Sequence, residues 1–214
     1  MNGLLLEKTR LELSKSLSKE EIGIFRKLDT PKKIQDFLEI LAINFDYKKD
    51  TCMSPRLALR KKKAHCIEGA FLAAAIQLFH GQKPLLLDLK SVERDFDHVV
   101  ALFSRNGKWG AFSKTNHAVL RYREPVYRDV RELAMSFFHE YFLDNGKKTM
   151  RSFSMPFNLL RFGLNWVTSE KPLWYIADAL DECRHYAILN KKGIASLRRA
   201  DAIEIQAGKL TQWK

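Results

Sequence analysis

Segment 60–81, RKKKAHCIEGAFLAAAIQLFHG, constrains the fold more than any other stretch of this sequence. A cluster of cations ends there, Cys66 follows, and a small-residue apolar helix begins. The apolar residues recur at helical spacing on one face: Ile67, Ala70, Phe71, Ala74 and Leu78. Gly81 is a natural helix terminator. A structural cysteine is expected in mid-helix on the apolar face, whereas Cys66 lies at the helix start beside charged residues.

The hydrophobic period changes after this helix. KPLLLDLK, at positions 83–90, predicts a short buried strand. DHVVALFSRNGKWGAFSKTNH, at 97–117, predicts two strands joined by Asn106-Gly107, which is the strongest short signal for a β-hairpin. We therefore expect a small antiparallel sheet in the middle of the chain.

Helices are expected on both sides of this sheet. SKEE has capping-box spacing, and Thr30 and Ser54 each precede a proline as N-caps. Segments 127–146 and 169–190 each predict one long helix, ended in the first case by Gly146 and opened in the second by Pro172. This order of elements, with helices before and after a central sheet, predicts an α+β fold. We expect residues 1–214 to form a single domain.

Two features of the sequence are expected to lower the pKa of the Cys66 thiol. A helix N-terminus carries partial positive charge and free N–H groups, and both favour the thiolate. The cations at 60–63 add positive potential just upstream. A nucleophilic thiol also needs a base and a group that orients the base.

The predicted hairpin supplies a base. His98 opens its first strand, and a two-residue loop at Asn106-Gly107 places His98 opposite Thr115. Side chains alternate along strands, so His98 and Ser113 project from the same face. Ser113 is then a diagonal neighbour of His98 and can orient its imidazole. Asp97 adjoins His98 but points to the other face.

This order of residues resembles the transglutaminase-like branch of the papain-type cysteine enzymes, and more narrowly a bacterial group within it. HCIEGAFLAAAIQLFHGQKPLLLDL is similar to the nucleophile helix, glycine turn and following strand of that family. DHVVALFSRNGKWGAFSKT resembles its histidine strand and the tryptophan-containing strand after it. The resemblance covers about residues 54–115, under a third of the chain.

The resemblance implies a papain/transglutaminase-like core, in which a nucleophile helix packs on a small antiparallel sheet between N- and C-terminal helices. It implies a hydrolase or acyltransferase that acts on an amide bond without a cofactor or metal. Cys66 would attack the carbonyl carbon, and His98 would move the proton. In the family an aspartate orients the histidine. The matching position in this sequence is Ser113, which departs from the family pattern. Asn116 would orient His98 instead if the strand kinks after Ser113.

Further site residues surround this pair. The Cys66 backbone N–H is the natural oxyanion donor, and His65 is a candidate for the second. His65, Glu68 and Trp109 are the candidate substrate-binding residues. For Glu68 the alternative is a favourable position at the helix N-terminus.

The net charge of the chain indicates what kind of partner it binds. The net charge of +12 favours anionic partners or surfaces. Segment 115–131 holds four arginines, whose side chains suit carboxylates or phosphates, although a solvated basic loop is the commoner case: Arg121, Arg123, Arg128 and Arg131. If this patch flanks the cleft, the peptide or protein amide substrate that the resemblance implies is expected to be acidic. Nucleic acid is an alternative that the scattered basic residues do not favour.

Three cysteines form neither a disulfide framework nor a CxxC pair. The first seventeen residues read as neither a signal peptide nor a membrane span, and a reducing cytoplasm follows as the default location.

Two other interpretations stay open. Cys66 can be a small core hydrophobe and His98 a partly exposed surface group, in which case the chain is a binding module with a degenerate triad. The third hypothesis is a basic protein associated with nucleic acid.

Overall fold

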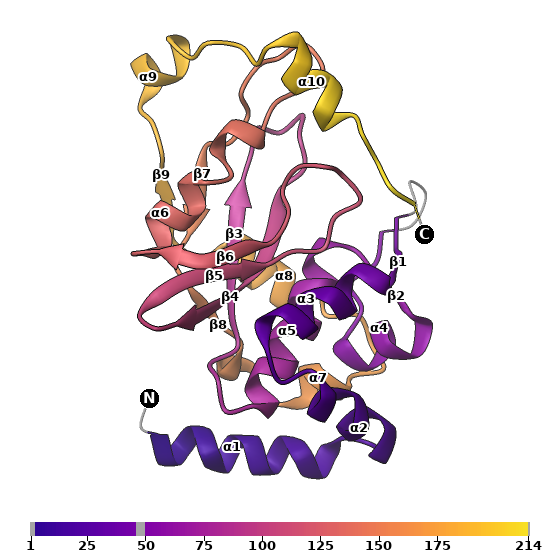
Figure 1. Cartoon of the computed structure of the whole chain (residues 1–214). Coiled ribbons are helices and arrows are strands. Elements are labelled where there is room, and N and C mark those ends of the chain that lie inside the picture. Colours follow the sequence, from indigo (N-terminus) through magenta and orange to yellow (C-terminus); the bar gives the residue numbers. More distant parts are fainter. Residues whose placement is uncertain (1–2, 46–49, 214) are drawn as a thin grey trace.

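The computed structural model describes residues 3–45 and 50–213, which form a mixed α/β fold around an antiparallel sheet (Figure 1). Its seven strands are β3 (Leu85–Lys90), β4 (His98–Arg105), β5 (Lys108–Phe112), β6 (Arg123–Tyr127), β7 (Ser152–Ser154), β8 (Phe157–Asn158) and β9 (His185–Ala187). Their order is β6-β5-β4-β3-β7-β9, and β8 pairs with β3. A separate parallel pair joins β1 (Ala42–Ile43) to β2 (Lys63–Ala64).

Helices precede the sheet strands in sequence, lie between the later strands and follow the last one. The N-terminal ones are α1 (Gly3–Ser16), α2 (Lys19–Lys27), α3 (Pro31–Ile40), α4 (Pro55–Lys61) and α5 (Cys66–Phe79). The C-terminal ones are α6 (Val130–Met135), α7 (Asn165–Thr168), α8 (Trp174–Asp181), α9 (Lys191–Ala195) and α10 (Ala202–Gly208). Short 3-10 turns occupy Phe138–Glu140 and Leu159–Phe162.

The helix starts expected from the sequence are confirmed. Ser18 and Glu21 form a reciprocal capping box at α2, with N–H to oxygen distances of 3.1 and 2.7 Å. Thr30 caps α3, and Ser54 caps α4. These caps form because each side chain satisfies a backbone N–H that has no partner within its helix.

Helix α5 is the centre of the larger core. Every residue from position 67 to 78 is buried, since the helix is apolar on all sides and must be covered on all sides. Helices α1, α3, α4 and α7 pack around it, and strand β4 covers the remaining side. Figure 1 shows these helices gathered on one side of the sheet, with α6 on the other.

The sheet separates two apolar clusters. Val99, Ala101 and Phe103 of β4 face the α5 side, whereas Val100 and Leu102 face α6 and Tyr141. The hairpin has the expected register, because Ala101 pairs with Phe112 and Arg105 with Lys108. Positive φ angles at Asn106 (53°) and Gly107 (72°) fit the tight turn.

The predictions of one long helix over 127–146 and another over 169–190 are both wrong. The first ends at Met135, and Gly146 (φ 78°) lies in a turn of the return chain rather than at a helix end. The second ends at Asp181, because residues 185–187 pair with β7 as strand β9. In both segments, backbone pairing and packing on the sheet override the helical spacing of the apolar residues.

Candidate functional site

Cys66 is the first residue of α5, as its sequence position predicts. Helix α4 ends at Lys61, and the following residue, Lys62, is in the left-handed region (φ 52°). Strand β2 then leads the chain to the start of α5. The backbone N–H of His65 donates to Glu68 Oε2 at 3.1 Å and closes the first turn. The thiol therefore lies among the unpaired N–H groups of a helix N-terminus.

Gly69 allows α5 to approach the end of β5. A Cβ atom at Gly69 would lie only 2.6 Å from Cβ of Lys114, the second residue after that strand. No other residue type fits without moving the helix or the strand end. This close approach brings the first turn of α5 next to the segment that carries Ser113.

His98 and Ser113 are in contact, as the register predicts. Nε2 of His98 lies 2.8 Å from Oγ of Ser113, and both residues are buried. The strand ends at Phe112, so Thr115 does not pair with His98 as expected. Ser113 reaches His98 from the chain immediately after the strand.

The hydrogen bonds of Ser113 determine which nitrogen of His98 carries the proton. Ser113 Oγ donates its only proton to the Leu120 carbonyl oxygen at 2.5 Å, because a carbonyl oxygen can only accept. Ser113 must then accept from His98, so Nε2 of His98 carries hydrogen. In the neutral ring, Nδ1 is therefore the basic nitrogen.

Leu120 has an unusual backbone. Its φ of 58° lies in the left-handed region, which is unfavourable for a leucine. Its N–H donates to Glu140 Oε2 at 2.6 Å, and Arg123 holds Glu140 by an ion pair of 2.6 Å. These contacts hold the Leu120 carbonyl against Ser113.

Two imidazoles act on the Cys66 thiol. Burial by itself raises the pKa of Cys66, but hydrogen bonds and charges from His65 and His98 outweigh burial and hold it well below the usual value. Nδ1 of His65 lies 3.9 Å from Sγ of Cys66. The site thus favours the thiolate.

His65 is held in place from its far side. Its Nε2 donates to the Thr51 carbonyl at 2.6 Å and lies 3.5 Å from Oε1 of Glu68. Burial acts to lower the pKa of His65, but Cys66, Glu68 and Thr51 together raise it to about 9. A protonated His65 therefore faces the thiolate at neutral pH.

The Glu68 side chain accepts hydrogen bonds within the protein and does not face the cavity. Its side chain is fully buried, and its carboxylate accepts from Asn44 Nδ2 (2.8 Å), Thr51 Oγ1 (2.7 Å) and Met53 N (2.8 Å). Together with the bond from the His65 amide, these contacts join residues 44–53 to α5. Glu68 does not line the cavity described next, so the structure gives no support to its expected substrate contact.

One cavity of about 630 Å³ contains Cys66, His65 and His98. Asn116 and Tyr141 also line it, and the Tyr141 hydroxyl donates to the Leu89 carbonyl at 3.2 Å. Asn116 is thus at the site, but Ser113 is the residue on the far nitrogen of His98. The cavity also receives Ile205, Gly208 and Lys209 from the C-terminal segment, which no sequence pattern indicated.

Trp109 lies elsewhere. It pairs with Ser104 near the hairpin turn, at the opposite end of β4 from His98, and it does not line the cavity. The structure gives its expected substrate contact no support.

The arginine patch is largely engaged in internal contacts. Arg121 pairs with Glu39 at 2.7 Å, and Arg123 with Glu140. Arg128 lies 3.4 Å from Glu132. None of the four arginines lines the cavity, so the structure gives no support to their binding an acidic substrate there.

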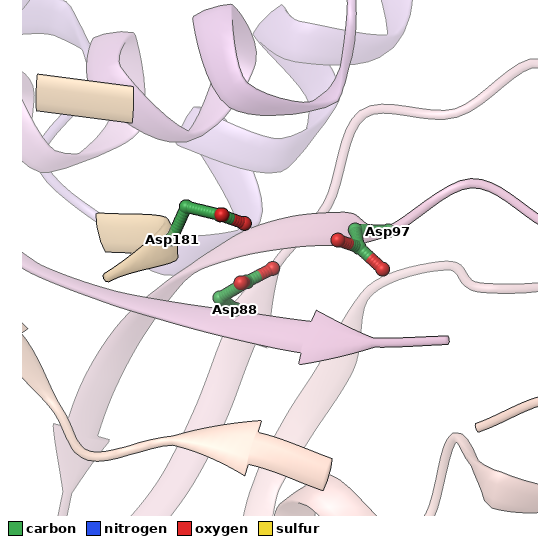
Figure 2. A group of neighbouring side chains, drawn as sticks. All are labelled: Asp88, Asp97 and Asp181. Carbon is green, nitrogen blue, oxygen red and sulfur yellow. The ribbon is translucent and has the colours of Figure 1, made fainter. Parts of the chain in front are cut away.

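Three carboxylates from neighbouring elements lie close together: Asp88 within β3, Asp97 just before β4 and Asp181 at the end of α8 (Figure 2). Lys90 Nζ donates to Asp97 at 2.8 Å and also contacts Asp181. His185 Nε2 lies 3.1 Å from Asp88 Oδ2. Because the chain's own ammonium group lies between two of the carboxylates, this cluster is an ion-pair network.

The other two cysteines differ from Cys66. Cys52 is fully buried, and burial raises its pKa to about 12. Burial also raises the pKa of Cys183. All three thiols are free.

Comparison with known proteins finds no family model that matches this sequence and no curated protein that is similar to it. Among the helices within residues 3–45 and 50–213, none combines the length and the apolar character needed to cross a bilayer.

Proposed function

We propose that this protein is a cysteine-dependent enzyme of the transglutaminase-like, papain-type class that transfers or hydrolyses an acyl group at an amide bond. One observation carries the proposal: Cys66 and His98 share a cavity, and Ser113 holds the far nitrogen of His98. A lowered thiol pKa, a base and an orienting group are the requirements of nucleophilic catalysis by cysteine.

The first half of the reaction would acylate Cys66. The thiol proton passes to Nδ1 of His98, and Sγ attacks the amide carbonyl carbon. A C–S bond forms, and the carbonyl oxygen becomes an oxyanion beside the Cys66 backbone N–H. His98 then gives its proton to the amide nitrogen, the C–N bond breaks, and a thioester and an amine result.

The second half would release the acyl group. His98 takes a proton from water or from an acceptor amine, which attacks the thioester carbonyl. The C–S bond breaks, and the sulfur leaves as thiolate. Protonated His65, 3.9 Å from Sγ, stabilises this thiolate and is positioned as a second donor near the helix N-terminus.

A binding module is the second candidate function. The observation that favours it is the neutral Ser113 in the place where the family has aspartate, since a hydroxyl does not stabilise an imidazolium by charge. In that case the cavity would bind its partner without forming a covalent bond.

Alkylation separates the two candidates. The intact protein is treated with iodoacetamide near pH 6, and labelled cysteines are identified by peptide mapping. We expect Cys66 to react first and His98→Ala to slow it at least tenfold. His139→Ala, which removes an exposed imidazole, is the matched control and should leave the rate unchanged.

A second measurement tests acyl transfer itself. Incubation with p-nitrophenyl acetate should leave one acetyl group on Cys66, detected by intact-protein mass and lost in Cys66→Ser. Labelling of Cys66 no faster than Cys183, with no trapped acetyl group, would favour the binding module.

A further inference from the structure

Two exposed aromatic side chains line the cavity, and a third, Trp213, packs against one of them; the three together form an aromatic rim. Phe45 and Phe96 line the cavity and are 43% and 78% exposed. Their ring centroids lie 6.4 Å apart at an interplanar angle of 87°. Trp213, 57% exposed, lies 6.2 Å from the Phe45 ring. Aromatic rings left in solvent around a cavity are typical of a recognition surface.

The cavity wall is acidic although the chain is basic. Its lining holds five carboxylates against two lysines and the protonated His65. The carboxylates are those of Asp50, Asp95, Asp97, Glu140 and Asp144, and the lysines are Lys114 and Lys209. This contrasts with the net charge of +12. Both lysines are engaged, since Lys114 is buried and donates to the Leu41 carbonyl at 2.7 Å, and Lys209 lies 3.4 Å from Asp144.

Two of these carboxylates have no cationic partner among the described residues. Asp97 and Glu140 are paired with Lys90 and Arg123. Asp50 accepts from the Thr51 amide at 2.9 Å. Asp95 accepts from the Phe96 amide at 2.9 Å and from the Thr149 hydroxyl at 2.5 Å. These neutral donors orient Asp50 and Asp95 without neutralising them.

We propose that the aromatic rim and the two carboxylates Asp50 and Asp95 bind an arginine side chain of the peptide that enters the cavity. This inference rests on the proposed function, because it names a feature of the substrate for the same site. A guanidinium group is flat, stacks on aromatic faces and pairs with carboxylates, so it matches both parts of the rim. The partner is then basic rather than acidic.

Peptide binding tests the proposal independently of catalysis. Calorimetry is carried out with Cys66→Ala, which cannot be acylated, and with acetyl-Gly-Gln-Xaa-Gly-amide peptides. In these peptides Xaa is arginine, lysine, citrulline, leucine or glutamate. Citrulline is the neutral match for arginine. We expect the arginine peptide to bind about tenfold more tightly than the citrulline peptide and the glutamate peptide to bind most weakly.

Variants locate the effect. Asp50→Asn and Asp95→Asn should each reduce arginine binding severalfold, and Asp50→Lys should abolish the preference over citrulline. Asp178→Asn removes an exposed carboxylate outside the cavity wall and should leave binding unchanged. Thermal unfolding confirms that each variant is folded.

Equal binding of the leucine and arginine peptides would overturn the proposal in favour of an apolar side chain. Preference for glutamate, or no binding by any peptide, would also overturn it. In each of these cases the alkylation of Cys66 still decides the proposed function by itself.

Discussion

Oγ of Ser113 lies 2.8 Å from Nε2 of His98 and donates its own proton to the Leu120 carbonyl. The hydroxyl is thus an obligatory acceptor from the imidazole, and Nδ1 is left as the base. In the proposed mechanism, the neutral Ser113 would orient His98 in place of the aspartate that the family resemblance implies. The hydrogen bond to Leu120 fixes the direction of the Ser113 hydroxyl.

Replacing Ser113 with alanine should lower the rate of Cys66 alkylation near pH 6 about tenfold, because the ring loses the bond that determines its tautomer. Ser113→Thr keeps the hydroxyl and should retain most of the rate. Ser113→Asp should not exceed the parent, since its carboxylate would face the Leu120 carbonyl oxygen. A faster Asp variant would contradict this account of Ser113.

The alkylation rate of Cys66 should change little as the pH falls from about 8 to about 6. The reason is that the pKa of Cys66 is held well below the usual value by His65 and His98, so the thiolate persists in this range. In His98→Ala the pKa rises, and the rate should fall as the pH falls. Cys52, whose pKa is raised to about 12, serves as an internal control and should stay unlabelled in the folded protein.

Charged His65 should stabilise the fold in a pH-dependent way. Its pKa rises from 6.5 in the unfolded chain to about 9 in the folded protein. The stabilisation is therefore fully present below pH 6.5 and is lost as the pH rises through about 9. The difference in Tm between the parent and His65→Gln should shrink between pH 6.5 and pH 9. A constant difference in Tm would rule out this linkage.

Gly69→Ala should separate Cys66 from His98. The added Cβ would lie 2.6 Å from Cβ of Lys114, so helix α5 or the strand end must move. We expect a loss of about 1–3 kcal/mol in the free energy of unfolding and slower alkylation of Cys66. Gly23→Ala is the matched control in α2, where nothing lies within 4 Å, and it should be neutral or slightly stabilising. Equal behaviour of the two variants would show that the close approach is unimportant.

Glu68→Gln should lower stability by about 1–3 kcal/mol, because an amide cannot replace all the acceptor sites of a buried carboxylate. The carboxylate accepts from Asn44, Thr51, Met53 and the His65 amide. The exposed residue Glu93 gives the control Glu93→Gln, which should unfold like the parent. Chemical denaturation measures both.

Several parts of the fold follow from the sequence because their causes are local. The caps at Ser18, Thr30 and Ser54 depend on residues within one helical turn. The Asn106-Gly107 turn determines the hairpin register, and the register brings Ser113 to His98. The predictions of two long C-terminal helices are wrong because residues 141–143 bond to residues 147–149, and residues 185–187 pair with β7. No local pattern reveals these partners.

The sequence by itself determined that Cys66 opens a helix and that His98 opens a hairpin strand, since helix and strand spacing are properties of neighbouring residues. Only the tertiary structure decided that Gly69 lets the helix meet Lys114, that Leu120 receives the Ser113 proton, and that His65 is held by Thr51. Those contacts join segments that are distant in the chain or lie in irregular loops. Their energies depend on how the layers pack, which periodicity does not encode.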